Sequence, residues 1–272
     1  MDLLEAGLSP EARENLFGDA AGNMLWSCRA DPRFCYYAYL PQREGPLPVI
    51  VYLHGTGREY PSPVREELEA FGRRHGCCVL APLFPGGITQ PDGFNGYKLL
   101  REGGVCYDLA LLEMLRELGE RCPAAQTRQV FLYGHSGGGQ FVNRFFFLHP
   151  HRLRGVCISA PGRPTFLDRT RPFYWGTQDW EAVFGGPIRM DLLRRVPVLL
   201  VVGSRERAFI GEAFCGQNRV ERVQALHKNF LENGVPATLA ILEGADHDSA
   251  SRERTRRFCQ WLEGTFGEEF LA

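Results

Sequence analysis

Short apolar runs rich in β-branched residues recur along this chain, with enough residues between them for a helix. Bounded by turn-forming residues, they cover positions 48–53, 78–83, 130–133, 156–159, 198–202 and 237–242. The first is apolar at every position rather than at alternate ones, which is typical of a strand buried on both faces of a largely parallel sheet. The pattern therefore predicts such a sheet at the centre of the fold.

Longer segments with apolar residues at helical spacing lie between these runs or follow them. They cover residues 64–75, much of 98–121, 140–149, 219–233 and 251–266. Three of them end beside a proline or a glycine, as helices commonly do: 98–121 at Cys122-Pro123, 140–149 at Pro150 and 219–233 at Gly234. Strands and helices thus alternate without a long linker or an internal repeat, which predicts one α/β domain over residues 1–272.

Three segments depart from this alternation. Residues 1–22 predict a peripheral helix, and residues 24–30 and 34–40 predict an antiparallel hairpin at one edge of the sheet. Residues 161–195 hold aromatic side chains among prolines and glycines, a pattern too irregular for a plain crossover helix, and predict a short lid-like segment. With the hairpin, the expected sheet has about eight strands.

The composition is that of a globular protein without an excess of basic charge. The 272 residues are 44% hydrophobic and 23% charged, as in an ordinary globular domain, and the formal net charge is −1. Because no excess of basic charge is present, we expect neither nucleic acid nor a membrane as a partner. The first residues lack a basic segment followed by an apolar core, so we expect a cytoplasmic protein. Oligomeric state is left open.

Cysteine and histidine spacing gives no sign of a metal centre. The nine cysteines form no Cys-x-x-Cys pair and no Cys/His cluster with the spacing of a zinc site. We therefore expect buried, reduced thiols, no metal and no organic cofactor.

The segment most informative about function follows the apolar run at 130–133. It reads Gly-His-Ser-Gly-Gly over residues 134–138, with an apolar helical segment directly after it. Gly-x-Ser-x-Gly in this context predicts a sharp strand-to-helix turn, in which glycines two residues on either side let strand and helix approach without Cβ clashes. The hydroxyl of Ser136 would then stand clear of the sheet, as a nucleophile must.

With this turn in place, the chain resembles an α/β-hydrolase and is similar to bacterial esterases and polyester depolymerases over roughly residues 48–272. The resemblance implies the α/β-hydrolase fold and a triad in the chain order serine, acid, histidine. Ser136 matches the nucleophile, and His247, after the last strand, matches the general base. Glu206 stands where the family usually has aspartate. Asp179, in the lid-like segment, is the alternative acid.

The chemistry requires each of these residue types. A serine hydroxyl is a weak nucleophile, so an imidazole must accept its proton and later return it to the leaving group. A carboxylate on the other ring nitrogen fixes the tautomer and stabilises the imidazolium. In this fold two backbone amides bind the oxyanion, and the matching positions here are Gly137 and Thr56.

These features predict a serine hydrolase that forms an acyl-enzyme, most simply a carboxylic ester hydrolase. Thioester, amide and lactone hydrolysis use the same machinery and stay open. The alternative function is a non-catalytic relative of the same fold, serving as a ligand-binding or interaction module. Such relatives generally lack the serine, the histidine or the glycines of the oxyanion loop, and this chain has all of them.

The aromatic residues suggest a substrate class. Tyr174, Trp175 and Trp180 in the lid-like segment, with Phe84 and Phe94 after earlier strands, are expected to line an apolar pocket. Such a pocket would take a small-molecule ester with an apolar or aromatic portion. The other interpretation is that these aromatic residues form the core of the lid.

Overall fold

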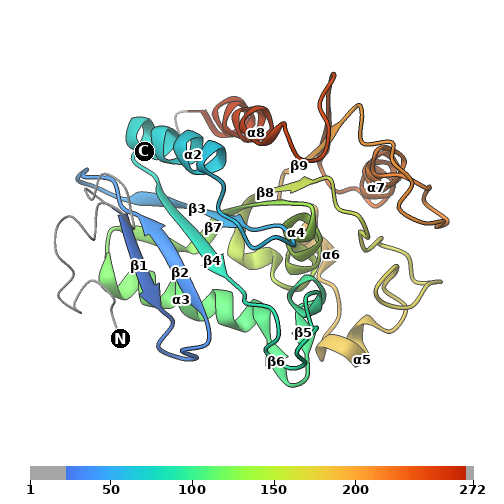
Figure 1. Ribbon diagram of the computed structural model, residues 1–272, viewed down its shortest axis with the longest axis horizontal. Coiled ribbons are helices and arrows are strands. Elements are labelled where there is room, and N and C mark those ends of the chain that lie inside the picture. The colour runs from blue at the N-terminus through green and yellow to red at the C-terminus, as the bar shows by residue number, and fades with distance from the viewer. Residues whose placement is uncertain (1–22, 268–272) are drawn as a thin grey trace.

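The structure is a computed structural model that describes residues 23–267, so the helix expected within residues 1–22 lies outside the described part. An eight-stranded sheet forms its centre, in the order β1-β2-β4-β3-β7-β8-β9-β10 (Figure 1). The strands are β1 (Asn23–Ser27), β2 (Cys35–Tyr39), β3 (Leu47–Leu53), β4 (Cys78–Leu83), β7 (Ala125–His135), β8 (Leu153–Ser159), β9 (Val198–Gly203) and β10 (Ala237–Leu242).

The sheet is parallel except at one edge. β1 pairs antiparallel with β2, and β2 pairs antiparallel with β4. The remaining pairs, in the order β4-β3-β7-β8-β9-β10, are parallel. This confirms the predicted edge hairpin and the expected number of strands. β3 is buried at every position, as its continuous apolar run predicts.

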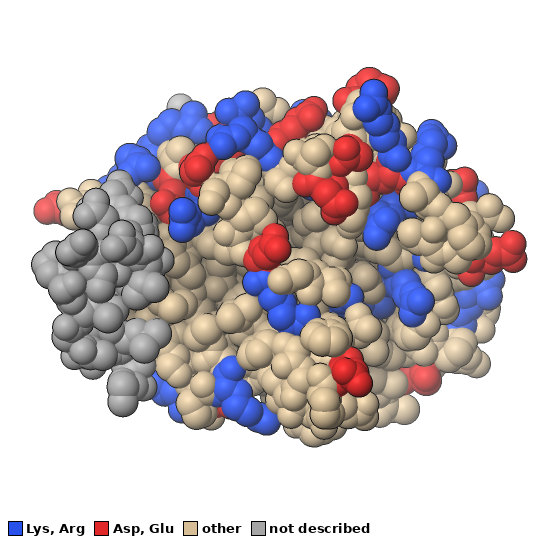
Figure 2. All heavy atoms as spheres, viewed as in Figure 1, with Lys and Arg blue, Asp and Glu red and all other residues tan. Residues whose placement is uncertain are grey.

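Helices cover both faces of the sheet. α2 (Ser62–His75) and α8 (Ser251–Phe266) pack together on one face. The opposite face is covered by α3 (Tyr107–Arg121), α4 (Gly137–Leu148) and α7 (Arg219–Glu232). Basic and acidic side chains are interspersed over the face of the molecule shown in Figure 2.

The helix predicted within residues 98–121 is present as α3, and the residues before it take another structure. The 3-10 helix η1 (Gly96–Leu99) and a small hairpin of β5 (Arg101–Glu102) and β6 (Val105–Cys106) precede α3. Gly103 and Gly104 form the hairpin turn with φ of 51° and 83°, a conformation that glycine adopts without strain and a helix excludes. As a result, η1 with Lys98 packs against α4 and is not part of α3.

Residues 161–195 connect β8 to β9 and contain the short helices α5 (Trp180–Phe184) and α6 (Met190–Leu193). A 3-10 helix, η2 (Pro150–Arg152), lies directly before β8. Trp180 anchors this segment to the domain. Only 3% of its surface is exposed, and its ring contacts those of Phe147, Phe173 and Phe184. The structure thus places Trp180 in the hydrophobic core.

We expect Trp180→Ala to lower the free energy of unfolding by about 3–5 kcal/mol, the usual cost of removing a large aromatic side chain from a core. Urea denaturation followed by far-UV circular dichroism measures the change. Phe209→Ala is the matched control, because Phe209 is 68% exposed and its loss should change stability by no more than about 0.5 kcal/mol. Equal stabilities for the two variants would contradict a core role for Trp180.

Candidate active site

Ser136 occupies the junction between β7 and α4. Its φ of 55° and ψ of −113° form a backbone conformation that is uncommon for a residue with a side chain. The turn is fixed by neighbouring groups: the Ser136 N–H donates to the Ser159 carbonyl at 2.9 Å, and the Gln140 N–H donates to the Ser136 carbonyl at 3.1 Å. The sharp strand-to-helix turn predicted from the glycine pattern is therefore present.

Two glycines let α4 pack directly against the sheet at this turn. A Cβ on Gly138 would lie 2.1 Å from the Leu53 carbonyl oxygen, and a Cβ on Gly134 would lie 2.4 Å from the Gly138 carbonyl oxygen. Both distances are far below van der Waals contact, and the obstructing atoms belong to the backbone. A larger residue at either position would therefore move α4 and with it Ser136.

His247 and Glu206 reach Ser136 from the loops after β10 and β9. His247 Nε2 lies 3.0 Å from Ser136 Oγ, and His247 Nδ1 lies 2.5 Å from Glu206 Oε2. Because a carboxylate only accepts hydrogen bonds, Nδ1 is the donor, which leaves Nε2 as the acceptor for the serine hydroxyl. The distance from Ser136 Oγ to Nε2 suits proton transfer from serine to imidazole.

The carboxylate of Glu206 is buried, with none of its side-chain surface exposed. Its second oxygen, Oε1, accepts a hydrogen bond from the Gly203 N–H at 3.0 Å. Arg219 Nε lies 3.9 Å from Oε2. One carboxylate oxygen is thus held by the backbone, which fixes the other against the imidazole.

The alternative acid, Asp179, lies elsewhere. Its Oδ1 accepts a hydrogen bond from the Phe173 N–H at 2.6 Å, within the segment between β8 and β9. The structure therefore brings Glu206, and not Asp179, to the imidazole of His247.

His135, next to the serine in sequence, supports the loop that carries His247. Its Nε2 lies 3.0 Å from the His247 carbonyl oxygen and its Nδ1 lies 3.1 Å from Ser159 Oγ. Burial and then the nearby positive charge of Arg254 lower the pKa of His135 well below its ordinary value. Arg254 donates to the same His247 carbonyl at 2.9 Å. The backbone of His247 is thus held by two side chains.

The backbone amides of Thr56 and Gly137 lie close together beside Ser136. The Thr56 nitrogen would be 3.2 Å from a Cβ built on Gly137. Gly137 is the first residue of α4, where a helical N–H has no carbonyl partner within the helix. Across residues 23–267 no hydrogen bond occupies either N–H, so both remain available to a ligand.

His54 fixes the loop that carries Thr56. Its Nε2 accepts from the Phe84 N–H at 3.0 Å, and its Nδ1 lies 2.7 Å from the Gly55 carbonyl oxygen. Burial is the main reason that the pKa of His54 falls to about 4, so the ring is neutral at physiological pH. A neutral ring can donate with one nitrogen and accept with the other, as this geometry requires.

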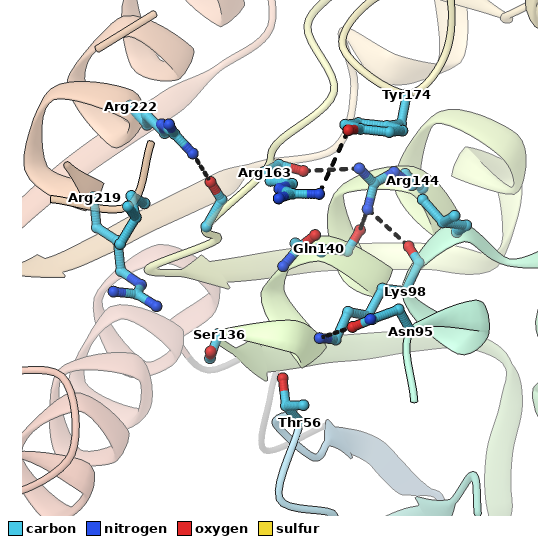
Figure 3. A pocket seen from close by; sticks show the side chains of 13 residues that line it. Thr56, Asn95, Lys98, Ser136, Gln140, Arg144, Arg163, Tyr174, Arg219 and Arg222 are labelled. Carbon is cyan, nitrogen blue, oxygen red and sulfur yellow. Dashed lines mark hydrogen bonds between the residues drawn. The ribbon is translucent and has the colours of Figure 1, made fainter. Parts of the chain in front are cut away.

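A pocket of about 340 Å³ opens onto Ser136 and Thr56 (Figure 3). Sequence reasoning missed its dominant feature, which is positive charge. The cationic lining residues are Lys98, Arg144, Arg163, Arg219 and Arg222, and no carboxylate among the described residues lines the pocket. Leu99 and Ile210 are the aliphatic side chains in the lining.

This lining differs from the apolar pocket expected from the aromatic residues. Of those residues, Tyr174 alone lines the pocket. Trp180 and Phe84 are buried in the core, Trp175 packs against the core at its edge, and Phe94 is half exposed at the surface. Most of these aromatic side chains therefore stabilise the domain rather than line the pocket.

Within residues 23–267, neither a membrane-spanning helix nor a metal-binding cluster of side chains is present. None of its helices has the length and apolar character needed to cross a membrane. Residues 23–267 also contain no group of three or more His, Cys, Asp or Glu side chains placed to hold a metal ion.

No family model and no curated protein matches this sequence. Solved structures do match. A poly(3-hydroxybutyrate) depolymerase from Bordetella parapertussis is 22% identical, with a TM-score of 0.71 over 98% of this chain and 100% of that chain. Poly(aspartic acid) hydrolase-1 from Sphingomonas sp. KT-1 is 18% identical, with a TM-score of 0.71 over 88% and 97%.

An S-formylglutathione hydrolase from Agrobacterium tumefaciens is 18% identical, with a TM-score of 0.61 over 89% of this chain and 95% of that chain. At such identities the structural similarity shows the fold and does not identify the reaction. The eight-stranded, mostly parallel sheet and these structural neighbours together show that the chain has the α/β-hydrolase fold.

Proposed function

We propose that this protein is a serine hydrolase that cleaves a carboxylic ester of a small molecule through an acyl-enzyme on Ser136. The observation that carries the proposal is the continuous chain of hydrogen bonds from Ser136 through His247 to Glu206. The two unoccupied amides beside the serine add to it, and so do the structural neighbours, which are hydrolases or depolymerases by name.

In the proposed reaction, Ser136 Oγ attacks the ester carbonyl carbon while its proton passes to His247 Nε2. Glu206 stabilises the resulting imidazolium, and the N–H groups of Thr56 and Gly137 bind the oxyanion, each typically contributing about a hundred- to a thousand-fold in rate. The imidazolium then gives its proton to the departing alcohol oxygen as the C–O bond breaks. A water molecule, activated by the same histidine, hydrolyses the acyl-enzyme.

The segment between β8 and β9 contributes Arg163 and Tyr174 to the pocket. We propose that residues 161–195 act as a short lid that shapes the substrate side of the site. This role rests on these lining residues, to which Gly162 also belongs, and on the packing of the segment against the domain.

The test is labelling with a fluorophosphonate, which reacts with activated serines, followed by peptide mass mapping. We expect the wild-type protein to be modified at Ser136, and we expect Ser136→Ala and His247→Ala to remain unlabelled. His227→Ala is the matched control, because His227 lies on α7 and contacts the Ala237 carbonyl instead of the serine. A folded wild-type protein that takes no label would refute the hydrolase and favour the ligand-binding module.

A further inference from the structure

The pocket above Ser136 concentrates positive charge in a protein whose net charge is −1. Five cationic side chains line about 340 Å³, and among the described residues no carboxylate lines it. On the face of the molecule shown in Figure 2, basic and acidic side chains both occur. Like charges repel one another more strongly where the dielectric constant is low. The clustered cations are therefore unfavourable until an anion binds in the pocket.

Two of the cations, Arg144 and Arg222, are buried and have only neutral partners. Arg144 donates to three backbone carbonyls and to the hydroxyl of Thr165. Arg222 donates to three glycine carbonyls. These bonds use at most four of the five N–H groups of Arg144 and three of the five of Arg222, and within residues 23–267 neither guanidinium forms an ion pair. Burial lowers the pKa of each guanidinium.

Two other cations keep donors free. Lys98 Nζ donates to Asn95 Oδ1 at 2.6 Å, which uses one of its three N–H groups. Arg219 Nε is buried and has no hydrogen-bond acceptor in the described part of the chain. Lys98 and Arg219 approach Ser136 from opposite sides of the pocket (Figure 3).

Lys98 also lies close to Gly137, whose N–H is one of the two free amides beside Ser136. Its Cε would lie 2.8 Å from a Cβ on Gly137, so its side chain packs on the glycine whose N–H is free. Burial and then the charge of Arg58 lower the pKa of Lys98 to about 8, so the ammonium group remains mostly protonated at neutral pH. A positive charge therefore stands next to the position of the scissile carbonyl.

We propose that the ester cleaved at this site carries a negatively charged group, bound in the pocket by Lys98 and Arg219 with Arg163 at the rim. The inference rests on the proposed hydrolase function and replaces the expected apolar portion with an anionic one. An anion supplies the missing counter-charge and accepts charge-assisted hydrogen bonds from the free donors. Carboxylate and phosphate-like groups share this chemistry.

The test compares three methyl esters on one carbon chain. Monomethyl glutarate carries a carboxylate, methyl 4-carbamoylbutanoate replaces it with a neutral amide of nearly the same shape, and methyl 4-phosphonobutanoate carries a phosphonate. We expect kcat/KM for the better anion to exceed that of the amide roughly tenfold to a hundredfold, as a charge-assisted hydrogen bond permits. The ranking of the two anions identifies the preferred group. An amide hydrolysed as well as both anions would overturn the proposal.

The chain offers a matched pair of variants, because Lys98 and Lys228 are its two lysines. Lys98→Met should reduce the anion-to-amide ratio of kcat/KM about tenfold or more. Lys228→Met removes the same charge from the exposed surface of α7, where Lys228 pairs with Glu232, and should leave the ratio as in the wild type. Equal ratios in the two variants would contradict the assignment. If Lys98→Met does not fold, Arg163→Met at the exposed rim provides the same comparison.

A second measurement needs no turnover. Glutarate should slow fluorophosphonate labelling of Ser136 at concentrations where glutaramide, its neutral diamide, does not. If Ser136 is labelled but glutarate protects no better than glutaramide, the anionic substrate class fails while the hydrolase stands. If Ser136 takes no label at all, the proposed function fails and this inference fails with it.

Discussion

Replacing Ser136 or His247 with alanine should lower kcat for a reporter ester such as 4-nitrophenyl acetate by about a million-fold, as in a serine protease with the same kind of triad. The reason is that the two residues act as one unit. His247 Nε2, 3.0 Å from Ser136 Oγ, can remove the hydroxyl proton only if that hydroxyl is present. Steady-state kinetics on the purified variants measures the loss.

The double variant Ser136→Ala/His247→Ala distinguishes this unit from two independent contributions. We expect it to be no slower than either single variant, because the remaining rate comes from the oxyanion amides and from binding. His227→Ala serves as the control for a general effect of removing a histidine. Losses that multiply in the double variant would show that the two side chains act separately.

The elements that build the site could be predicted because their signals are local. The Gly-x-Ser-x-Gly pattern after an apolar run predicts that Ser136 lies on a turn. Its two outer glycines are needed there, because a Cβ on either would lie only 2.1–2.4 Å from a backbone carbonyl oxygen. His247 and Glu206 follow the last two parallel strands, and the carboxyl ends of parallel strands meet at one edge of a sheet. The structure brings these three side chains within hydrogen-bond distance, and their catalytic role is the proposal.

The pocket could not be predicted in the same way, because its cations come from separate parts of the chain. Lys98 lies on η1, Arg144 on α4 and Arg219 on α7, and only the folded sheet brings them together. A net charge of −1 averages over the whole chain and hides this local concentration. The helical pattern within residues 98–121 also gave no sign that Lys98 lies on η1, separated from α3 by the hairpin turn at Gly103 and Gly104.

Aromatic residues were misleading for a related reason. Tyr174 and Trp180 are six positions apart in a segment without regular periodicity, yet one lines the pocket and the other lies in the core. Periodicity indicates which face a residue takes only in a helix or a strand. In an irregular segment, burial depends on tertiary contacts, here those of Trp180 with the rings of Phe147 and Phe184.

Replacing Glu206, the acid that contacts His247, should cause the second large loss of activity. Glu206→Gln should lower kcat by about a thousand- to ten-thousand-fold. The amide oxygen of glutamine can still accept from the Gly203 N–H, but its NH₂ group then faces His247 Nδ1 as a donor. The imidazole would have to carry its proton on Nε2, where it cannot accept the proton of Ser136. Steady-state kinetics, with circular dichroism to verify folding, measures the effect.

Asp179→Asn is the matched control, because it makes the same chemical change in the acid that the structure places away from the site. Its amide oxygen can still accept from the Phe173 N–H, so kcat should stay near the wild-type value. A large loss in Asp179→Asn together with normal turnover in Glu206→Gln would reverse the assignment. Glu206→Asp sharpens the comparison: a side chain shorter by one methylene cannot reach both the Gly203 N–H and His247 Nδ1. We therefore expect its kcat to lie between those of the wild type and Glu206→Gln.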